Sequence, residues 1–494
     1  MDSITTAVGL VFALTFLFYA FQTLSFSRRK NLPPGPTPLP VIGNLHLLGD
    51  QPHKSLARLA KIYGPLMRLR LGSVNTVVVS SATVAREVLQ KQDMAFSSRS
   101  APNAVHAHDQ FKYSVVWLPV ASRWRSLRKT MNSNIFSGSR LDANQHVRSR
   151  KVEELIAYCR ESSRKAEAVD VSHAAFRTSM NSLSNTIFSK DLAHPLSDSD
   201  KEFKQVVSKI MIEAGKANLV DFFPFLARFD PQGIRRRTTL YFGKVIDLFS
   251  GLIDERLEKR KSQHGEESAS DVIDVLLNAS DQEIDRTHIE RMCLDLFVAG
   301  TDTTSSTVEW AMAEAIKNPE TMKKAKAELE QVVGKGKIIR ESDISRLPYV
   351  RCMVKETLRL HPPVPFLIPR RVDQDVEVMG SIVPKNSRVL VNTWAIGRDP
   401  DVWKDPLEFK PHRFLDSEVD VRGTDFELIP FGAGRRICPG LPLAMRMVPV
   451  MLGSMLNSFD WKMEGGMELE MEDKFGITLV KAHPLKAVPV PISF

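Results

Sequence analysis

The sequence predicts a mainly α-helical single domain with small β-sheets. Apolar residues at helical spacing, or strong helix formers, occupy the longest patterned stretches, which are 152–160, 201–213, 242–260, 289–316 and 319–333. Strand-like runs are fewer and shorter, at 66–71, 76–80, 376–379 and 388–392. Helices and strands do not alternate, and no linker divides the chain after Pro40. A doubly wound nucleotide-binding fold is therefore disfavoured.

The composition is that of a globular protein with a sizeable core, since 43% of the 494 residues are hydrophobic and 25% are charged. The net charge of +9 suits anionic lipid or an acidic protein as a partner. Nucleic acid is disfavoured, because the chain has neither zinc-finger spacing nor an RNA-binding signature. The cysteines form no CxxC pair, which argues against a disulfide scaffold and fits a reducing compartment. They are Cys159, Cys293, Cys352 and Cys438.

The N-terminus predicts a transmembrane anchor. Residues 4–26 carry no charged side chain, and a helix of that length spans roughly 34 Å, enough for a bilayer core. The basic cluster 28–30 follows at once, which keeps the downstream side cytosolic. A cleaved signal peptide is disfavoured because Asp2 is the only early charge. We expect an anchor over 1–27, a basic and proline-rich hinge over 28–40, and a catalytic domain over 41–494.

A glycine-rich loop ending in cysteine, Phe431-Gly-Ala-Gly-Arg-Arg-Ile-Cys-Pro-Gly440, precedes an apolar helical stretch. Glycines let a backbone approach a flat ring closely. Backbone N–H groups beside the sulfur can hold it as a thiolate, and an axial thiolate on haem iron favours cleavage of the O–O bond. The loop predicts Cys438 as a metal ligand and places Arg436 to meet a haem propionate.

Three helical patterns accompany that loop. Glu356 and Arg359 share one helix face, and Arg413 offers a third partner for a buried ionic network, although exposed pairs of this kind contribute little. Asp302 and Thr303 follow Ala299-Gly300 inside a long helical pattern, where small and hydroxyl residues can open the helix and admit water. An alcohol beside an acid there would relay protons to dioxygen, although a helix N-cap is the simpler interpretation of such residues.

Trp124 and Arg128 stand four residues apart, so both can approach the haem propionates from one helix face. The basic residues beside them, Arg123, Arg125 and Lys129, would then gather on the surface. A solvated basic helix explains those last three residues nearly as well.

These motifs, in this order, resemble those of the cytochromes P450 over essentially the whole chain. The resemblance implies the single, mostly α P450 fold with haem b buried between two helices and Cys438 as its iron ligand. It implies Asp302 and Thr303 as the oxygen-activation pair. The implied cofactor contacts are Trp124, Arg128, Arg370, Phe431, Arg436, Cys438 and Gly440. One departure is His412, where the family often has Glu; Arg413 is retained, so we expect the ionic network to survive.

Narrower stretches, among them LGDQPHKSLA at 48–57 and VVWLPVASRWRSLRK at 115–129, resemble the geraniol 8-hydroxylase group of plant P450s. That resemblance implies hydroxylation of an allylic methyl of geraniol, on the route to iridoids. It also implies dioxygen as co-substrate and electrons from NADPH–cytochrome P450 reductase on the endoplasmic reticulum. The segment between Gly466 and Glu472 is slightly shorter than in that group, which would alter the approach to Ile477.

By the same analogy, an apolar substrate pocket is expected. Its expected wall residues are Ala104, Val105, Phe111, Val298, Ala299, Val364, Phe366, Leu367 and Ile477. Such a pocket discriminates modestly between similar ligands, so another terpenoid, a phenylpropanoid or a flavonoid remains an alternative substrate. Two alternatives of other classes are a haem-thiolate isomerase and a non-catalytic haem-binding protein. The retained Asp302–Thr303 pair argues against the isomerase, and the retention of every catalytic motif argues against the binding protein.

Overall fold

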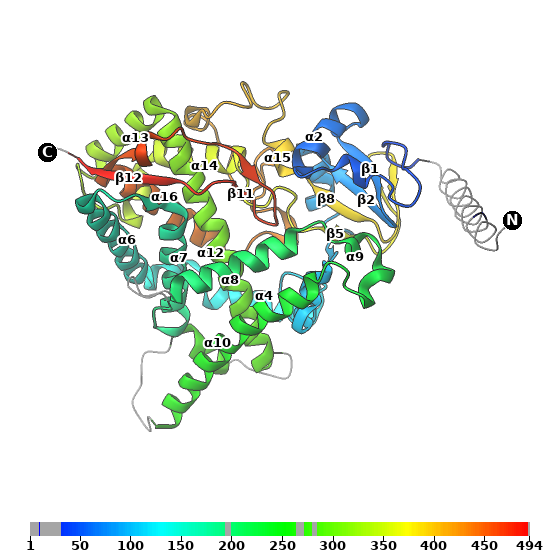
Figure 1. Cartoon of the computed structure of the whole chain (residues 1–494), viewed down its shortest axis with the longest axis horizontal. Coiled ribbons are helices and arrows are strands. Elements are labelled where there is room, and N and C mark those ends of the chain that lie inside the picture. The colour runs from blue at the N-terminus through cyan, green and yellow to red at the C-terminus, as the bar shows by residue number, and fades with distance from the viewer. Residues whose placement is uncertain (1–8, 10–30, 193–198, 263–270, 279–283, 493–494) are drawn as a thin grey trace.

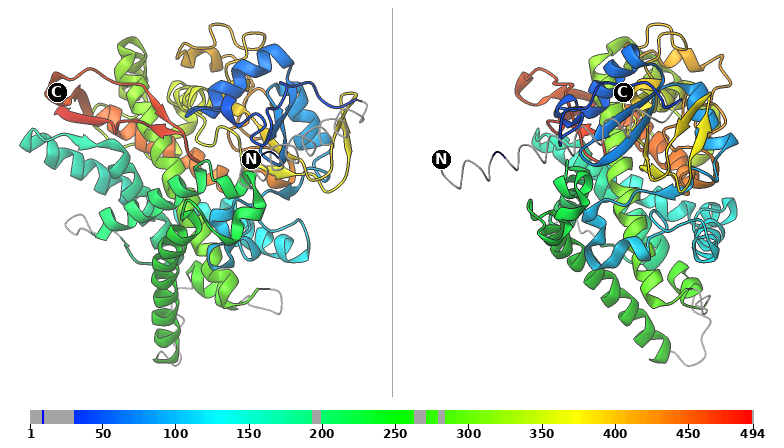
Figure 2. Two further views of the ribbon diagram at one scale, coloured as in Figure 1. Left: turned by 45° about the vertical axis from the view of Figure 1, so that its right-hand side comes forward. Right: turned by 90° about the vertical axis from the view of Figure 1, so that its right-hand side faces the viewer.

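The computed structural model describes residues 9, 31–192, 199–262, 271–278 and 284–492. Helices build a broad body, and a smaller β-rich lobe packs against one side of it, nearer the N-terminus (Figure 1). The far end of α10 (Ile234–Ser262) extends away from the body in both turned views (Figure 2). The mainly helical single-domain fold with small sheets is the one that the sequence predicts.

The longer helices contain the helical stretches that the sequence predicts, except that α13 ends one residue before the predicted end of 319–333. They are α2 (Pro52–Tyr63), α4 (Ser122–Asn134), α6 (Gln145–Lys165), α7 (Val171–Phe188), α8 (Ser199–Gly215), α10, α12 (Arg286–Lys317), α13 (Pro319–Val332), α14 (Pro348–Leu360) and α16 (Leu441–Ser458). The shorter ones are α3 (Ala82–Arg86), α5 (Gly138–Ala143), α9 (Leu219–Phe222), α11 (Val272–Asn278) and α15 (Thr393–Ile396).

The helix α12 runs through the centre of the body (Figure 1). It begins at a cap in which the Asp285 side chain accepts a hydrogen bond from the backbone N–H of His288, at 3.0 Å. Its central turns are buried on most sides because α7, α14 and α16 pack around it. A helix covered in this way needs small and apolar residues over most of its surface, which its sequence supplies.

The main sheet has the strand order β1-β2-β8-β5-β3. Its strands are β1 (Leu66–Leu71), β2 (Val74–Val79), β8 (Arg388–Val391), β5 (Arg370–Arg371) and β3 (Ser98–Arg99). β2 and β8 are parallel, and the other neighbours are antiparallel. There are three smaller sheets among the described residues. The first has the strand order β4 (Val169–Asp170), β12 (Lys486–Pro491) and β9 (Phe459–Met463). The other two are hairpins, one of β6 (Val376–Val378) with β7 (Ser381–Val383) and one of β10 (Asp473–Lys474) with β11 (Val480–Lys481).

The proline-rich hinge docks on the β lobe over the part that the structure describes. The Arg68 N–H donates to the Pro34 carbonyl at 2.8 Å, and the Asn44 N–H donates to the Arg70 carbonyl at 2.6 Å. Gly35 lies so close to the strand that an added Cβ would stand 1.8 Å from the Arg68 carbonyl oxygen. The anchor expected over 1–27 lies outside the described residues apart from Gly9, and none of the described helices is long and apolar enough to cross a bilayer.

Candidate active site

Cys438 lies in the turn between the 3₁₀ helix η7 (Gly434–Arg436) and α16. Its N–H donates to the Phe431 carbonyl at 2.9 Å, which closes the loop around the sulfur. Gly434 has a φ of +66°, and an added Cβ would stand 2.0 Å from the Leu89 carbonyl oxygen, so the turn needs glycine there. Burial raises the pKa of Cys438, while the N–H groups of Gly440 and Leu441 and the charge of Arg128 lower it. The loop thus holds donors that stabilise a thiolate.

The other cysteines lack this setting. Cys159, Cys293 and Cys352 are all buried, and none lines the cavity at Cys438. Burial raises the pKa of Cys159 and Cys293 to about 12 and that of Cys352 to about 11. All three therefore behave as small apolar core residues, as the sequence predicts.

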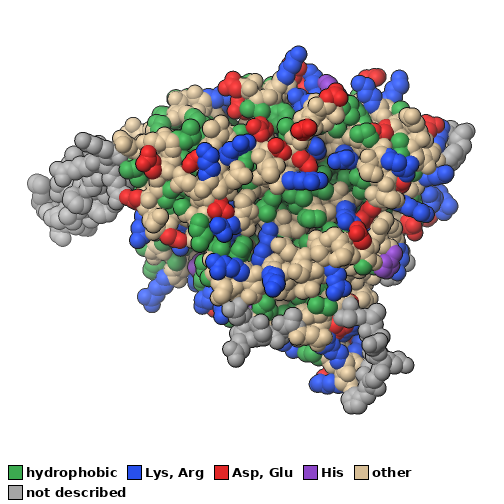
Figure 3. Space-filling view, turned by 180° about the vertical axis from the view of Figure 1, so that it is seen from behind, with side chains coloured by type: hydrophobic (Ala, Val, Ile, Leu, Met, Phe, Trp, Pro, Cys, Tyr) green, Lys and Arg blue, Asp and Glu red, His purple; other side chains and the backbone are tan. Residues whose placement is uncertain are grey.

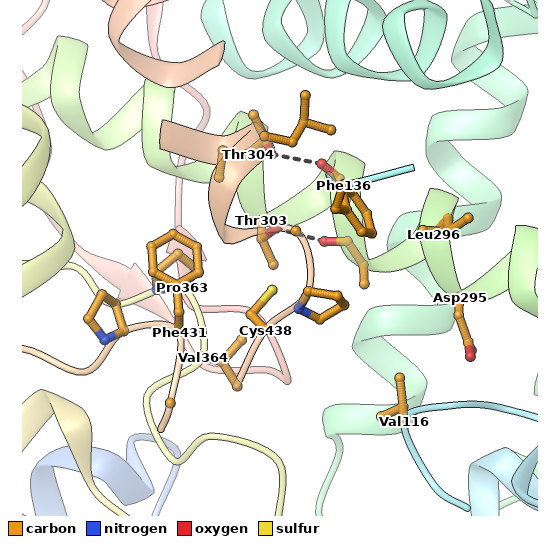
Figure 4. A pocket seen from close by; sticks show the side chains of 18 of the residues that line it. Val116, Phe136, Asp295, Leu296, Thr303, Thr304, Pro363, Val364, Phe431 and Cys438 are labelled. Carbon is orange, nitrogen blue, oxygen red and sulfur yellow. Dashed lines mark hydrogen bonds between the residues drawn. The ribbon is translucent and has the colours of Figure 1, made fainter. Parts of the chain in front are cut away.

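A cavity of about 280 Å³ opens over the sulfur of Cys438. Figure 4 shows the sulfur beside Thr303 of α12, Val364 and Phe431. One stripe of α12 forms a wall, because residues four apart lie on the same helix face. The residues of that stripe are Asp295, Leu296, Ala299, Gly300, Thr303, Thr304 and Thr307.

A cluster of cations lines the same cavity, formed by the buried Arg370 and Arg436 and the half-buried Arg99 and Arg128. Their hydrogen-bond donors contact carbonyl oxygens only. Arg99 Nη1 lies 2.5 Å from the Ile368 oxygen, and Arg370 Nη1 lies 2.9 Å from the Phe96 oxygen. Arg436 Nε lies 3.0 Å from the Ser97 oxygen, and Arg128 Nη2 lies 2.5 Å from the Ile437 oxygen. None has an ion-pair partner among the described residues.

The uncompensated charge and the unpaired donors of this cluster show whether its residues suit a haem. Burial lowers the pKa of Arg370 and of Arg436 to about 10, and it lowers that of Arg99 well below its ordinary value. The Nε atoms of Arg99 and Arg370 are buried without a hydrogen-bond partner. Buried charge of one sign is costly unless opposite charge compensates it. Two propionates would supply that charge and those acceptors, so the residues fit a haem whose iron meets Cys438.

Trp124 and Arg128 come from α4, as predicted. The indole Nε1 of Trp124 donates to the Val115 carbonyl at 3.1 Å, and the Arg436 guanidinium lies over its ring, 4.9 Å from the centroid. Trp124, Arg128, Arg370, Phe431, Arg436, Cys438 and Gly440 all line the cavity, so the structure brings the predicted cofactor contacts together. The neighbouring basic residues Arg123, Arg125 and Lys129 are exposed.

The side chains of Asp302 and Thr303 point to different sides of α12. Thr303 lines the cavity, and its hydroxyl donates to the Ala299 carbonyl at 2.7 Å, as Thr304 does to Gly300 (Figure 4). Asp302 lies outside the cavity lining, buried beside Thr478 of the β10–β11 hairpin. Burial raises the pKa of Asp302, and Thr478 and Lys204 lower it. The helix runs unbroken through both residues, so the opening that their residue types can favour is not present there.

The ionic network forms as predicted. The Glu356 carboxylate accepts from Arg359 Nε at 2.7 Å and from Arg413 Nε at 3.0 Å, and both Glu356 and Arg359 are buried. Arg359 also donates to the carbonyls of Gly397 and Pro406, at 2.5 and 2.7 Å. The network therefore ties α14 to the segment after α15. His412 is exposed, so its side chain takes no place inside the network.

The expected pocket residues separate into two groups. Ala299, Val364 and Leu367 line the cavity. The others lie outside its lining, namely Ala104, Val105, Phe111, Val298, Phe366 and Ile477. Phe366 packs on Phe475, with ring centroids 5.7 Å apart, and Phe111 stacks on His106 at 4.3 Å. Within the 363–367 segment, Pro363, Val364 and Leu367 therefore face the cavity, while Phe366 faces the β lobe.

Two charged residues of the cavity lining, Arg99 and Asp295, were not expected from the sequence. Arg99 stands in the two-residue strand β3, whose partner Arg370 is far away in the chain. Nothing local marks it. Asp295 offers a signal, since it interrupts the apolar run 292–298 and stands eight residues before Thr303, on the same helix stripe.

Comparison with known proteins agrees with this geometry. The family described as Cytochrome P450 matches residues 33–488. The chain is 68% identical to geraniol 8-hydroxylase from Swertia mussotii and 70% identical to geraniol 8-hydroxylase from Catharanthus roseus, each over 99% of both chains. A solved zebrafish cytochrome P450 with abiraterone has a TM-score of 0.73 and 25% identity, covering 90% of this chain and 100% of that one. The resemblance seen in the motifs is confirmed.

Proposed function

The chain belongs to the cytochrome P450 family, and on that premise we propose that it is a monooxygenase that hydroxylates geraniol at C8, an allylic methyl, in iridoid or monoterpenoid biosynthesis. The observation that carries this proposal is the high identity to two geraniol 8-hydroxylases over nearly the full length. The cavity supports it, because Cys438 shares one space with a mostly apolar wall that suits a terpenol.

Haem b is the proposed cofactor, with Cys438 as the iron ligand and Arg99, Arg128, Arg370 and Arg436 around the propionates. When bound, the haem would supply oxidising power from dioxygen and electrons, while the protein supplies orientation and protons. Thr303 presents its hydroxyl oxygen to the cavity wall and holds a proton there. Asp302 lies behind it, toward Thr478, and would exchange protons from the far side of α12.

The electron donor is proposed to be NADPH–cytochrome P450 reductase. Lys and Arg side chains are spread over the face seen in Figure 3, interspersed with acidic and apolar ones. The exposed Arg123, Arg125 and Lys129 of α4 lie on the helix that also carries Trp124 and Arg128 to the cavity. A basic surface so close to the cofactor site suits an acidic redox partner.

We place the protein at the endoplasmic reticulum membrane, held by the anchor expected over 1–27. Apolar side chains are exposed beside the docked hinge, at Leu39, Val41 and Ile42, and on the α9 segment, at Leu219, Phe225 and Phe229. The two groups adjoin, because the turn at 72–73 bonds to the carbonyls of Ile42 and Phe222, at 3.1 and 2.9 Å. Such a surface suits contact with lipid.

The test is reconstitution of the full chain with a plant reductase, NADPH and geraniol, with mass spectrometry for 8-hydroxygeraniol. Product supports the proposal, and Cys438→Ala should abolish both the product and the thiolate-type carbon monoxide spectrum. An intact spectrum without product would eliminate geraniol and turn the search to other terpenoids and phenolics. Conversion of substrate without reductase would instead favour an isomerase.

A further inference from the structure

Asp295 is the single carboxylate among the described residues that line the cavity, and only 7% of its surface is exposed. Its Oδ1 accepts from Ser114 Oγ at 2.8 Å and from Gln110 Nε2 at 3.1 Å, and its Oδ2 accepts from the Val115 N–H at 2.9 Å. None of the ion pairs among the described residues includes it. A buried acid without a cation is costly, and burial raises the pKa of Asp295 to about 7.

The hydrogen bonds tie the turn 110–115 to α12, but they leave capacity on the carboxyl group. A carboxylate oxygen can accept two hydrogen bonds. Oδ2 receives one from the Val115 N–H, and the next N–H of the turn, that of Val116, donates to Ser114 Oγ at 3.1 Å and lies close enough to the carboxyl group to lower its pKa. Figure 4 shows Asp295 and Val116 on one side of the cavity, away from Cys438. The carboxyl group therefore adds a polar acceptor to a mostly apolar wall, at a distance from the sulfur.

Its position along α12 matches the length of the substrate. Asp295 stands eight residues before Thr303, which corresponds to about 12 Å along a helix axis. Eight bonds separate C8 of geraniol from its hydroxyl oxygen, so the extended molecule spans roughly 10 Å. A geraniol whose C8 methyl lies next to Thr303 would thus bring its hydroxyl close to Asp295.

The other hydroxyls of the α12 stripe are engaged within the helix. Those of Thr303, Thr304 and Thr307 donate to carbonyls four residues earlier, at 2.7, 2.7 and 2.8 Å. Ser179 of α7 also lines the cavity, and its hydroxyl is buried without a hydrogen-bond partner. Ser179 is therefore the rival polar contact that an experiment has to separate from Asp295.

We propose that Asp295 is a specificity-determining residue. Its carboxyl group accepts a hydrogen bond from the terminal hydroxyl of the terpenol, and this contact directs the C8 end of the terpenol toward the haem. The proposal rests on the proposed hydroxylation of geraniol and names the contact that selects it. It implies that the site prefers an alcohol to the corresponding hydrocarbon, because the hydrocarbon leaves the carboxyl group without that partner.

The test measures binding to the full-length holoenzyme from the change in the haem absorption spectrum. The ligands are geraniol, its methyl ether and the deoxygenated 2,6-dimethylocta-2,6-diene. The wild type should bind geraniol about tenfold or more tightly than either analogue, which lacks the donor. Equal affinity for all three would overturn the proposal without any variant.

Variants then locate the contact. Asp295→Leu should remove the preference by weakening geraniol binding about tenfold, with the hydrocarbon bound as before. Ser114→Ala, which loosens the same turn but keeps the carboxyl group, should keep the preference, and so should Ser179→Ala. Loss of the preference in Ser179→Ala, or its survival in Asp295→Leu, would overturn the assignment. An intact thiolate spectrum with carbon monoxide shows that each variant is folded.

The two proposals fail separately. A wild type that prefers geraniol through Asp295 but forms no hydroxylated product would eliminate the proposed reaction and keep the contact. A wild type that hydroxylates geraniol at C8 yet binds the alcohol and the hydrocarbon alike would keep the reaction and eliminate the contact.

Discussion

Arg99 and Arg370 are direct register partners on the antiparallel strands β3 and β5, and both side chains line the cavity at Cys438. Neither has an ion-pair partner among the described residues. Burial lowers the pKa of both guanidinium groups, and the charge of Arg370 lowers that of Arg99 further. Without a haem, this pair opposes folding. Two haem propionates would compensate these charges, so the same pair should stabilise the complex.

We therefore expect Arg99→Leu to stabilise the haem-free protein and to weaken haem binding in the holoenzyme. The haem-free protein should become more stable to heat, because a half-buried cation without an ion-pair partner is removed. The holoenzyme should lose haem about tenfold faster, because a charge-assisted contact to a propionate is missing. Thermal melts of both forms and the rate of haem transfer to apomyoglobin measure these changes.

The matched control is Arg371→Leu. Arg371 is the next residue on β5, is exposed, and pairs with Asp373 at 3.1 Å. Arg371→Leu should change the melting temperature of the haem-free protein and the rate of haem loss by no more than the small effect of losing a surface ion pair. Equal haem retention in the wild type and Arg99→Leu would remove Arg99 from the propionate site.

Glu356→Gln should destabilise the fold strongly. The substitution leaves Arg359 buried with its charge uncompensated, which costs about 3–5 kcal/mol in comparable buried pairs. Glu161→Gln provides the contrast, because Glu161 meets Arg164 at the same i,i+3 spacing on an exposed surface. That change should cost less than about 1 kcal/mol. Denaturant unfolding of the two variants gives the comparison, and similar losses would mean that the buried network contributes little.

The sequence predicts those features whose signal is local. Helices such as α12 follow from apolar spacing, and the Cys438 turn follows from glycines that the structure needs at Gly434. Features that depend on distant partners carry no local signal. Arg99 meets the cavity only because β3 pairs with β5, and Phe366 turns to the β lobe because Phe475 packs there.

The separation of Asp302 from Thr303 has a geometric cause. Consecutive residues on an α-helix point about 100° apart, and the stripe that faces the cavity at this turn consists of Thr303 and Thr304, so Asp302 falls beyond its edge. Thr303 faces the cavity, and Asp302 faces the hairpin that carries Thr478. Residue order suggests the pair, but the helix places its members on different sides.

Thr303→Ala should uncouple the enzyme without unfolding it. The Cys438 loop is untouched, so the thiolate spectrum should remain, while NADPH consumption is diverted to peroxide and product per NADPH falls about tenfold or more. Thr304→Ala is the matched variant, since its hydroxyl makes the same 2.7 Å bond one residue later on the cavity wall. Thr304→Ala should lose less product per NADPH than Thr303→Ala does. Tight coupling in Thr303→Ala would place proton delivery elsewhere.

The buried Glu309 of α12 should make stability depend on pH. Its carboxylate accepts the Leu485 N–H at 2.8 Å, and burial raises its pKa to about 7, with Asp170 adding to the rise and Lys204 and Lys481 opposing it. Because the folded state holds this proton more tightly than the unfolded chain, stability should fall as pH rises from about 4.5 to about 7 and then level off.

Glu309→Gln keeps an oxygen for the Leu485 N–H and cannot ionise, so it should remove this part of the pH dependence. The wild type should lose about 1 kcal/mol per pH unit relative to the variant within that window, since one pKa unit corresponds to that energy. Melting temperatures of both proteins at pH 5, 6, 7 and 8 measure the difference. Parallel curves would mean that Glu309 is already ionised in the folded protein at pH 5, with Lys204 and Lys481 compensating its charge.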